Sequence, residues 1–380
     1  MYEVQVLRGL AEVTAAEWDT LVGADSPFLE WGWLASLEDS ACVARRTGWL
    51  PQHLIVRDPS GRVIAACPLY LKGHSMGEFV FDHEWAAAAQ RAGIEYYPKL
   101  LVAVPFTPAA GSRFLTAPGN DRPALIRALG GALREICDRN DFSSVHVNFC
   151  QPDEVVALRE VGFVERIGFQ YQWRNVGYRS FDDYLDHFRS KRRNQIKRER
   201  RALDEQGVTI DVRVGDAIPD QWFAPMFDFY KSTIDKLYWG RQYLHPEFFE
   251  RLRARFKRNL CFVVAHQDGA PIAGTFNVQK GGVFYGRYWG ATRELRHLHF
   301  NVCYYAAIAH CIEHGLQRFE PGAGGEFKTL RGFDPQRTFS MHYIRDPRLA
   351  AAIERFLLAE RCEVDRVVEW MHERSELKGQ

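Results

Sequence analysis

An acid and two bases follow a glycine-rich turn at residues 322–325. Glu326 is a candidate general base, acting through a tuned pKa or a water chain, and an ion pair that holds the loop is the alternative. Lys328 is the second candidate catalytic residue. Lys328 and Arg331 lie three residues apart and suit a phosphate or a carboxylate, with surface ion pairs as the alternative. A charged glycine loop that follows a strand indicates a small-molecule site built at strand ends.

A β-type run precedes this turn, at 283–291, and alternates aromatic residues with glycines. Arg287 and Tyr288 in this run are expected to bind substrate. Tyr288 and Trp289 should point to opposite faces of the strand, so only one of them is expected to line a pocket while the other packs in the core.

Two histidines are further candidate bases. His299 lies near the start of an apolar-periodic helix expected at 298–316, and His342 lies in the last expected strand. An imidazole can exchange a proton near neutral pH, although a histidine with apolar neighbours is more often a packing residue.

A helix expected at 181–206 is crowded with positive charge. Four of its cations share one face: Arg189, Arg193, Lys197 and Arg200. Arg192 and Arg201 fall elsewhere on the helix. We expect the first three to bind phosphate groups, with a solvated helix balanced by neighbouring acids as the alternative.

The order of expected elements is β-α-α-β-β-β-α-β-α-β in the first half, and the second half repeats it. This predicts an α/β fold of two tandem domains, each a mixed, mostly antiparallel sheet flanked by helices, at residues 1–178 and 179–380. A hairpin around the turn at 58–61 belongs to the first domain.

Several motifs spread over nearly the whole chain resemble the FemAB-like branch of the GCN5-related N-acyltransferase (GNAT) superfamily. They are Ser26-Pro27-Phe28-Leu29, Gly77-Glu78-Phe79-Val80-Phe81-Asp82, Tyr96-Tyr97-Pro98-Lys99-Leu100, Val104-Pro105-Phe106-Thr107-Pro108, Gly286-Arg287-Tyr288-Trp289-Gly290, Leu298-His299-Phe300, Cys303-Tyr304-Tyr305 and Phe319-Glu320-Pro321-Gly322-Ala323. The resemblance implies a bacterial N-acyl or aminoacyl transferase, a peptidoglycan precursor as acceptor, and main-chain donors supplied by splayed central strands. It also implies that the phosphates bound by Arg189, Arg193 and Lys197 belong to a nucleotide-linked precursor or to a tRNA acceptor end. Gly324 and Phe327 depart from the Gln and His of the family's glycine loop.

The acyl donor is expected to be aminoacyl-tRNA or acyl-coenzyme A, with no tightly bound cofactor and no metal. A loop after a strand in the first half, with Gly111 and Arg113, is the candidate coenzyme site, because main-chain N–H groups of such loops hold pyrophosphate. Pro105 and Pro108 remove two such donors, which argues against ordinary acetyl-coenzyme A. The alternatives are an acetyl-coenzyme A-dependent acetyltransferase acting on a small molecule and a catalytically silent protein that binds the precursor.

Composition excludes other classes. A net charge of +1 over 380 residues gives no global field for DNA, so any contact with a polyanion must be local. The chain has no long apolar run, and its first residues lack the charged and apolar regions of a signal peptide. Its eight scattered cysteines form no Cys-x-x-Cys pair. These features predict a cytoplasmic location.

Overall fold

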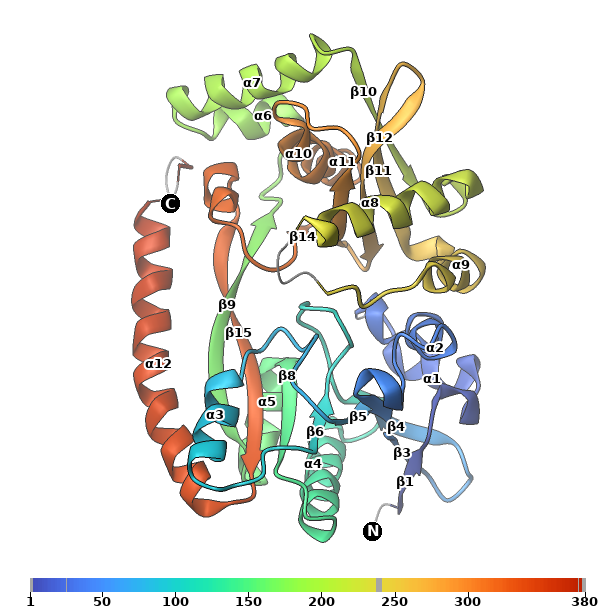
Figure 1. The fold of residues 1–380 in the computed structure, drawn as a ribbon, viewed down its shortest axis with the longest axis vertical. Helices are drawn as coiled ribbons and strands as arrows, with labels where there is room; N and C mark the ends of the chain where they lie inside the picture. The colour runs from blue at the N-terminus through green and yellow to red at the C-terminus, as the bar shows by residue number, and fades with distance from the viewer. Residues whose placement is uncertain (1–2, 25, 237–240, 375, 378–380) are drawn as a thin grey trace. The chain divides into compact units, whose positions relative to one another are not determined.

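The computed structural model describes the whole chain except residues 1–2, 25, 237–240, 375, 378–380 and the side chain of Glu326. The chain forms two compact units (Figure 1). Unit 1 comprises residues 1–169 and 337–366, and unit 2 comprises residues 170–336 and 367–380. Strand β9 (Val164–Arg174), strand β15 (Asp334–Ile344) and helix α12 (Pro347–Glu373) each contribute residues to both units. The predicted domain boundary after residue 178 remains a prediction.

Unit 1 contains two sheets. The larger has the order β15-β8-β6-β5-β2, and the smaller has the order β1-β3-β4-β7. The strands are β1 (Glu3–Leu7), β2 (Trp49–Pro51), β3 (His53–Arg57), β4 (Val63–Cys67), β5 (Leu69–Lys72), β6 (Lys99–Val102), β7 (Leu115–Thr116) and β8 (Ser144–Cys150). The helices are α1 (Ala15–Val22), α2 (Trp31–Asp39), α3 (His83–Arg91), α4 (Arg122–Arg139) and α5 (Pro152–Glu160). Strands β3 and β4 form the hairpin predicted around residues 58–61.

The core of unit 1 follows from strand alternation. Apolar side chains at every second position of β6 and β8 pack with Leu125 and Leu129 of α4. Several of the intervening side chains are polar yet buried, including Lys99 of β6 and His146 of β8. Lys99 donates to Glu78 at 2.8 Å and also bonds Asp82, so its charge is neutralised inside the protein.

Unit 2 has one sheet with the order β10-β11-β12-β13-β14-β9. Its further strands are β10 (Val208–Val214), β11 (Leu260–Gln267), β12 (Ala270–Lys280), β13 (Val283–Ala291) and β14 (Arg318–Glu320). Its helices are α6 (Phe181–Asp186), α7 (Ser190–Asp204), α8 (Phe223–Asp235), α9 (Pro246–Arg255), α10 (Leu298–Phe300), the π-helical segment η7 (Asn301–Tyr305), α11 (Ala306–Glu313) and the 3-10 segment η8 (Glu326–Arg331). Strands β13 and β14 are parallel, and the neighbouring pairs are antiparallel.

Two helices of unit 2 differ from their predicted form. The helix expected at 181–206 is broken into α6 and α7, because Phe188 pairs with Leu377 and the N–H of Arg189 donates to the Glu376 carbonyl instead of continuing a helix. The helix expected at 298–316 spans 298–313 and widens into π-helix at its centre. The mixed, mostly antiparallel α/β architecture predicted from the element order is confirmed.

Candidate functional site

Strands β13 and β14 separate after a short parallel contact. Pairing covers only Val283 to Tyr285 of β13, and β13 then continues alone on that side to Ala291. Opposite β12, the register skips Arg287, so a β-bulge lies at this residue. Bulges disturb the ladder and redirect side chains, and they are common beside active sites. The splayed strands expected from the family resemblance are therefore present in unit 2.

Two glycines allow this part of β13 to pack closely. A Cβ on Gly290 would lie 1.7 Å from the carbonyl oxygen of Phe229 in α8. A Cβ on Gly286 would lie 3.2 Å from the ring of Phe319 in β14. The glycine spacing of the strand therefore lets α8 and the end of β14 approach its backbone.

A pocket of about 260 Å³ opens where the two strands separate, and we call it the glycine-loop pocket. It is lined by Thr275 and Asn277 of β12, residues 286–289 of β13, His299, Cys303 and Tyr304 of the α10–η7 helix, Phe319 and Pro321, and the loop residues Ala323, Gly324, Gly325, Phe327 and Lys328. Four predicted site residues thus come together: Arg287, Tyr288, His299 and Lys328. All of the lining belongs to unit 2.

Lys328 is a buried cation in this pocket. Only 3% of the residue is exposed, and its Nζ donates to the Gly322 carbonyl at 2.6 Å, which ties the glycine loop together. Burial lowers the pKa of Lys328 to about 8, because an ammonium loses hydration inside the protein. Lys328 is therefore mostly charged at neutral pH but can release its proton far more readily than an exposed lysine.

His299, at the start of the helix, also lines the pocket. Its ring meets the Trp289 ring edge-on at 4.9 Å between centroids and the Tyr304 ring at 5.4 Å. Burial, together with the charges of Arg331 and Lys328, lowers the pKa of His299 to about 4. The imidazole is therefore neutral at physiological pH and can accept a hydrogen bond or a proton.

The rings of Tyr288 and Trp289 point to opposite faces of β13, as predicted. Tyr288 packs on Tyr230 of α8, and Trp289 packs on His299. Both residues nevertheless border the glycine-loop pocket, so the expectation that only one would do so is wrong. The guanidinium of Arg287 lies 5.3 Å from the centre of the Tyr288 ring.

Arg331 does not line this pocket. It is 2% exposed, and its guanidinium donates to Glu199 at 3.1 Å and to the Phe327 carbonyl at 2.8 Å. The guanidinium also stacks on Phe300, 3.5 Å from the ring centre. Its predicted contact with substrate is therefore replaced by a buried ion pair that anchors η8 to α7, because the turn of η8 directs Arg331 inward.

Two other loop predictions have different outcomes. The side chain of Glu326 lies outside the described part of the structure, so its role as a base remains a prediction. Phe327, which stands where the family has histidine, is 58% exposed and borders the pocket. Its ring lies 5.9 Å from that of Phe300.

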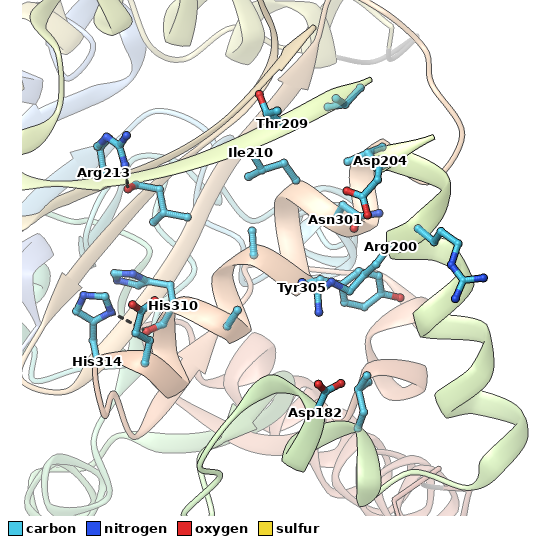
Figure 2. A pocket seen from close by; sticks show the side chains of 18 of the residues that line it. Asp182, Arg200, Asp204, Thr209, Ile210, Arg213, Asn301, Tyr305, His310 and His314 are labelled. Carbon is cyan, nitrogen blue, oxygen red and sulfur yellow. Dashed lines mark hydrogen bonds between the residues drawn. The ribbon is translucent and has the colours of Figure 1, made fainter. Parts of the chain in front are cut away.

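The basic helix α7 borders a second, larger hollow of about 1070 Å³, which we call the edge-strand pocket (Figure 2). Of the three predicted phosphate ligands, only Lys197 lines it; Arg193 instead pairs with Asp186 at 3.2 Å, and Arg189 is the N-cap of α7. Arg201 was expected on another face but lines this hollow with Lys197 and Arg200. The three follow an i, i+3, i+4 spacing, which gathers side chains on one side of a helix.

The candidate coenzyme loop of unit 1 is closed by its own hydrogen bonds. Arg113 is fully buried, and its guanidinium donates to the carbonyls of Asn148, Gly111 and Ala109 at 2.7, 3.0 and 2.6 Å. The N–H groups of Arg113 and Gly111 are also taken, by Glu154 and the Phe149 carbonyl. The predicted cofactor role of Gly111 and Arg113 is therefore wrong, since the main-chain donors that would hold pyrophosphate are already used.

His342 also lies away from the glycine-loop pocket, in unit 1. Its Nδ1 is 2.7 Å from Nδ1 of His146, and its Nε2 is 2.9 Å from the Ser340 hydroxyl. Burial holds the pKa of His342 well below its usual range. It forms part of a buried polar network rather than a base at this pocket.

Sequence reasoning missed Thr275, Asn277 and Cys303 as pocket residues. Asn277 bonds Thr275 Oγ1 at 2.9 Å, and both lie on a strand that shows only apolar alternation in sequence. Cys303 is brought to the pocket by η7, and π-helical turns often occur at functional sites but leave no sequence signature.

Among the described residues, no group of acids, histidines and cysteines could hold a metal ion, and no helix is long and apolar enough to cross a membrane.

Comparisons with known proteins agree with this architecture. The model of the FemAB-like family, described as peptidoglycan biosynthesis/recognition, matches residues 9–379. No curated protein sequence matches the chain.

Solved structures share the fold at low identity. A crystal structure of FemX is 13% identical, with 93% of this chain and 100% of that chain covered and a TM-score of 0.58. The C-terminal domain of a putative lysylphosphatidylglycerol synthetase from Agrobacterium fabrum is 11% identical, with 91% and 96% covered and a TM-score of 0.56. L-PGS from Bacillus licheniformis is 10% identical, with 85% and 95% covered and a TM-score of 0.51. The chain therefore shares the fold of these structures, belongs to the FemAB-like family and is an acyl or aminoacyl transferase.

Proposed function

We propose that the protein transfers an aminoacyl group from aminoacyl-tRNA to an amine on a peptidoglycan precursor, and that the glycine-loop pocket is its active site. The observation that carries the proposal is the pocket at the separation of β13 and β14, which Lys328 and His299 both line. A donor carried on tRNA would place the reaction in the cytoplasm, as the sequence predicts.

The chemistry requires an amine to attack an ester carbonyl and the tRNA hydroxyl to leave. Main-chain groups of β13 beyond Tyr285 border the pocket and can orient the carbonyl. As the C–N bond forms, neutral His299 takes the proton that the attacking nitrogen loses. Charged Lys328 stabilises the developing oxyanion and supplies a proton to the leaving oxygen. Glu326 remains a predicted alternative base.

A donor other than coenzyme A is supported by unit 1. In its loop at 109–113, the N–H groups of Gly111 and Arg113 already donate to the Phe149 carbonyl and to Glu154, so these two donors are not available to a pyrophosphate.

The test is a transfer assay with labelled aminoacyl-tRNA and a nucleotide-linked muramyl peptide that carries a free side-chain amine, with the product identified by mass spectrometry. Lys328→Met should lower turnover by about 100-fold, the usual loss when one oxyanion donor is removed. Lys231→Met, at an exposed lysine of α8, is the matched control and should leave turnover unchanged. Acetylation by acetyl-coenzyme A without aminoacyl transfer would overturn the proposed donor.

A further inference from the structure

Asn277 of β12 borders the glycine-loop pocket with a side chain that is almost completely buried. Only 2% of the residue is exposed, and its neighbour on the same face, Thr275, also lines the pocket. The register of β12 against β13 shifts next to Asn277, which therefore stands opposite Gly286. A glycine within a strand often marks a place where a ligand comes close. At this position β13 has no side chain to cover Asn277.

The direction of the Asn277 amide is fixed by its NH₂ group. Nδ2 donates to the Cys261 carbonyl at 3.1 Å, to Thr275 Oγ1 at 2.9 Å and to the Thr275 carbonyl at 3.3 Å. An amide nitrogen carries two hydrogens, so both are used on β11 and β12. Turning the amide over would point its oxygen at two carbonyls, which cannot donate to it. The amide is therefore held in one orientation.

The oxygen of this amide is left as an open acceptor. None of the described residues donates a hydrogen bond to Asn277 Oδ1, and this oxygen is not sealed inside the protein. A largely buried acceptor without a donor costs stability, and native proteins keep few such atoms. Because Asn277 lines the pocket, we expect a bound molecule to supply the missing donor.

The other polar groups of the pocket indicate which donor this is. The charged side chains among its described lining residues are Arg287 and Lys328, two cations that only donate hydrogen bonds and that disfavour a further ammonium. The pocket therefore favours a neutral amine. A neutral primary amine has two N–H groups and needs two acceptors, and neutral His299 and Asn277 Oδ1 can supply one each.

We propose that Asn277 is a substrate-binding residue of the transfer reaction, whose Oδ1 accepts a hydrogen bond from the attacking amine. As the C–N bond forms, the N–H at His299 breaks and the N–H at Asn277 remains in the amide product. The ester oxygen leaves with a proton from Lys328. Thr275 is a positioning residue, because its hydroxyl fixes the Asn277 amide. The inference rests on the proposed function for the attacking amine and not on the identity of the acyl donor.

The test compares a muramyl peptide that carries a primary side-chain amine with the same acceptor carrying an N-methyl amine. The neutral N-methyl amine has a single N–H, which the reaction needs at His299, so Asn277 is left without a donor. The native protein should therefore prefer the primary amine in kcat/KM by about tenfold, the worth of one hydrogen bond. Asn277→Ala should slow transfer to the primary amine by a similar factor, but transfer to the N-methyl amine by less than about twofold.

Three further variants separate this contact from a structural role. Thr275→Val removes the hydroxyl that fixes the amide and should lower the preference for the primary amine, whereas Thr275→Ser keeps a hydroxyl and should retain it. Gln279→Ala is the matched control, since Gln279 is an amide of the same strand that contacts His310 outside the pocket, and it should leave the preference unchanged. Each preference compares two acceptors on one preparation, so the fraction of folded protein cancels. If Asn277→Ala does not fold, Thr275→Val carries the test.

Equal slowing of both acceptors by Asn277→Ala would overturn the inference, because it would indicate a structural role. Equal rates with the two acceptors in the native protein would overturn it too, since the second N–H would then be unused. Transfer from another acyl donor, with the preference lost in Asn277→Ala, would reject the proposed donor and retain the role of Asn277. A native protein that transfers to no amine would reject the proposed function and this inference together.

Discussion

Replacing Lys328 by methionine should make the protein more stable at neutral pH. The pKa of Lys328 is lowered from 10.5 to about 8 by burial, so holding this ammonium inside unit 2 costs about 3 kcal/mol at pH 7, at 1.36 kcal/mol per pH unit. Methionine has a similar length and no charge. It loses the 2.6 Å bond to the Gly322 carbonyl, and a hydrogen bond from a charged group is worth about 1.5–3 kcal/mol. We therefore expect a net gain of up to about 1.5 kcal/mol at pH 7.

The sign of the pH dependence makes this prediction specific. Below about pH 8 the lysine is protonated in both the folded and the unfolded chain, so the full cost is present. Between about pH 8 and 10.5 the folded protein has released the proton while the unfolded chain still holds it, so native stability rises with pH. The methionine variant lacks this rise. Its advantage should therefore shrink above pH 8 and reverse by about pH 10.

Urea unfolding of the native protein, Lys328→Met and Lys231→Met at pH 7, 8, 9 and 10 measures this difference. Comparing variants cancels the titration of all other groups. A stability difference between the native protein and Lys328→Met that stays constant from pH 7 to 10 would refute the argument, since it would show that Lys328 carries no burial cost. Increased stability together with lost transfer would mark Lys328 as a residue retained for function at the expense of folding.

Three further predictions test the placement of other residues. Arg331→Ala should lower the free energy of unfolding by about 3–5 kcal/mol by leaving Glu199 buried without its cation, and Arg331→Met/Glu199→Gln should recover part of this loss in urea unfolding. Gly290→Ala should prevent stable folding of unit 2, because its Cβ would lie 1.7 Å from the Phe229 carbonyl oxygen. In contrast, a Cβ at Gly131 of α4 would meet no atom within 4 Å, so Gly131→Ala should stabilise the protein by up to about 1 kcal/mol in thermal unfolding. Millimolar acetyl-coenzyme A should leave the unfolding temperature unchanged, whereas a ligand at 100 times its dissociation constant would add about 2.7 kcal/mol of stability.

Local patterns predicted the elements that depend on neighbouring residues. Strand alternation identified β13, and the turn at 58–61 identified its hairpin, because both are determined within a few residues. The break between α6 and α7 could not be predicted, since it depends on pairing of Phe188 with Leu377, far away in sequence. Sharing of β15 and α12 between the two units has the same origin, because only long-range contacts decide which core a segment joins.

The residues of the candidate site divide in the same way into those that local sequence predicts and those whose position depends on distant partners. Arg287, Tyr288, His299 and Lys328 were predicted from residue type and from motifs near strand ends, and the structure brings them to one pocket. The inward direction of Arg331 was not predictable, because it depends on Glu199, 132 residues earlier in the chain. A buried ion pair and an exposed ligand-binding arginine look alike in sequence, since only the fold decides which partner is within reach.

Both units contain two parallel strands that separate, but the space between the strands is filled in unit 1 and open in unit 2. In each, a pair of parallel strands separates after three paired residues, β6 from β8 in unit 1 and β13 from β14 in unit 2. In unit 1, the carbonyls of Asn148 and Phe149, just past the last pair, accept hydrogen bonds from Arg113 and Gly111, so the chain fills its own opening.

The buried lysines of the two units also differ in whether carboxylates neutralise their charge. Lys99 of unit 1 is neutralised by Glu78 and Asp82, whereas burial of Lys328 in unit 2 lowers its pKa to about 8 beside an open pocket. The carboxylates of Glu78 and Asp82 hold the pKa of Lys99 above its usual value, whereas a lysine with a lowered pKa can exchange a proton near neutral pH. We therefore infer that chemistry takes place in unit 2 and that unit 1 retains the fold without the donor site.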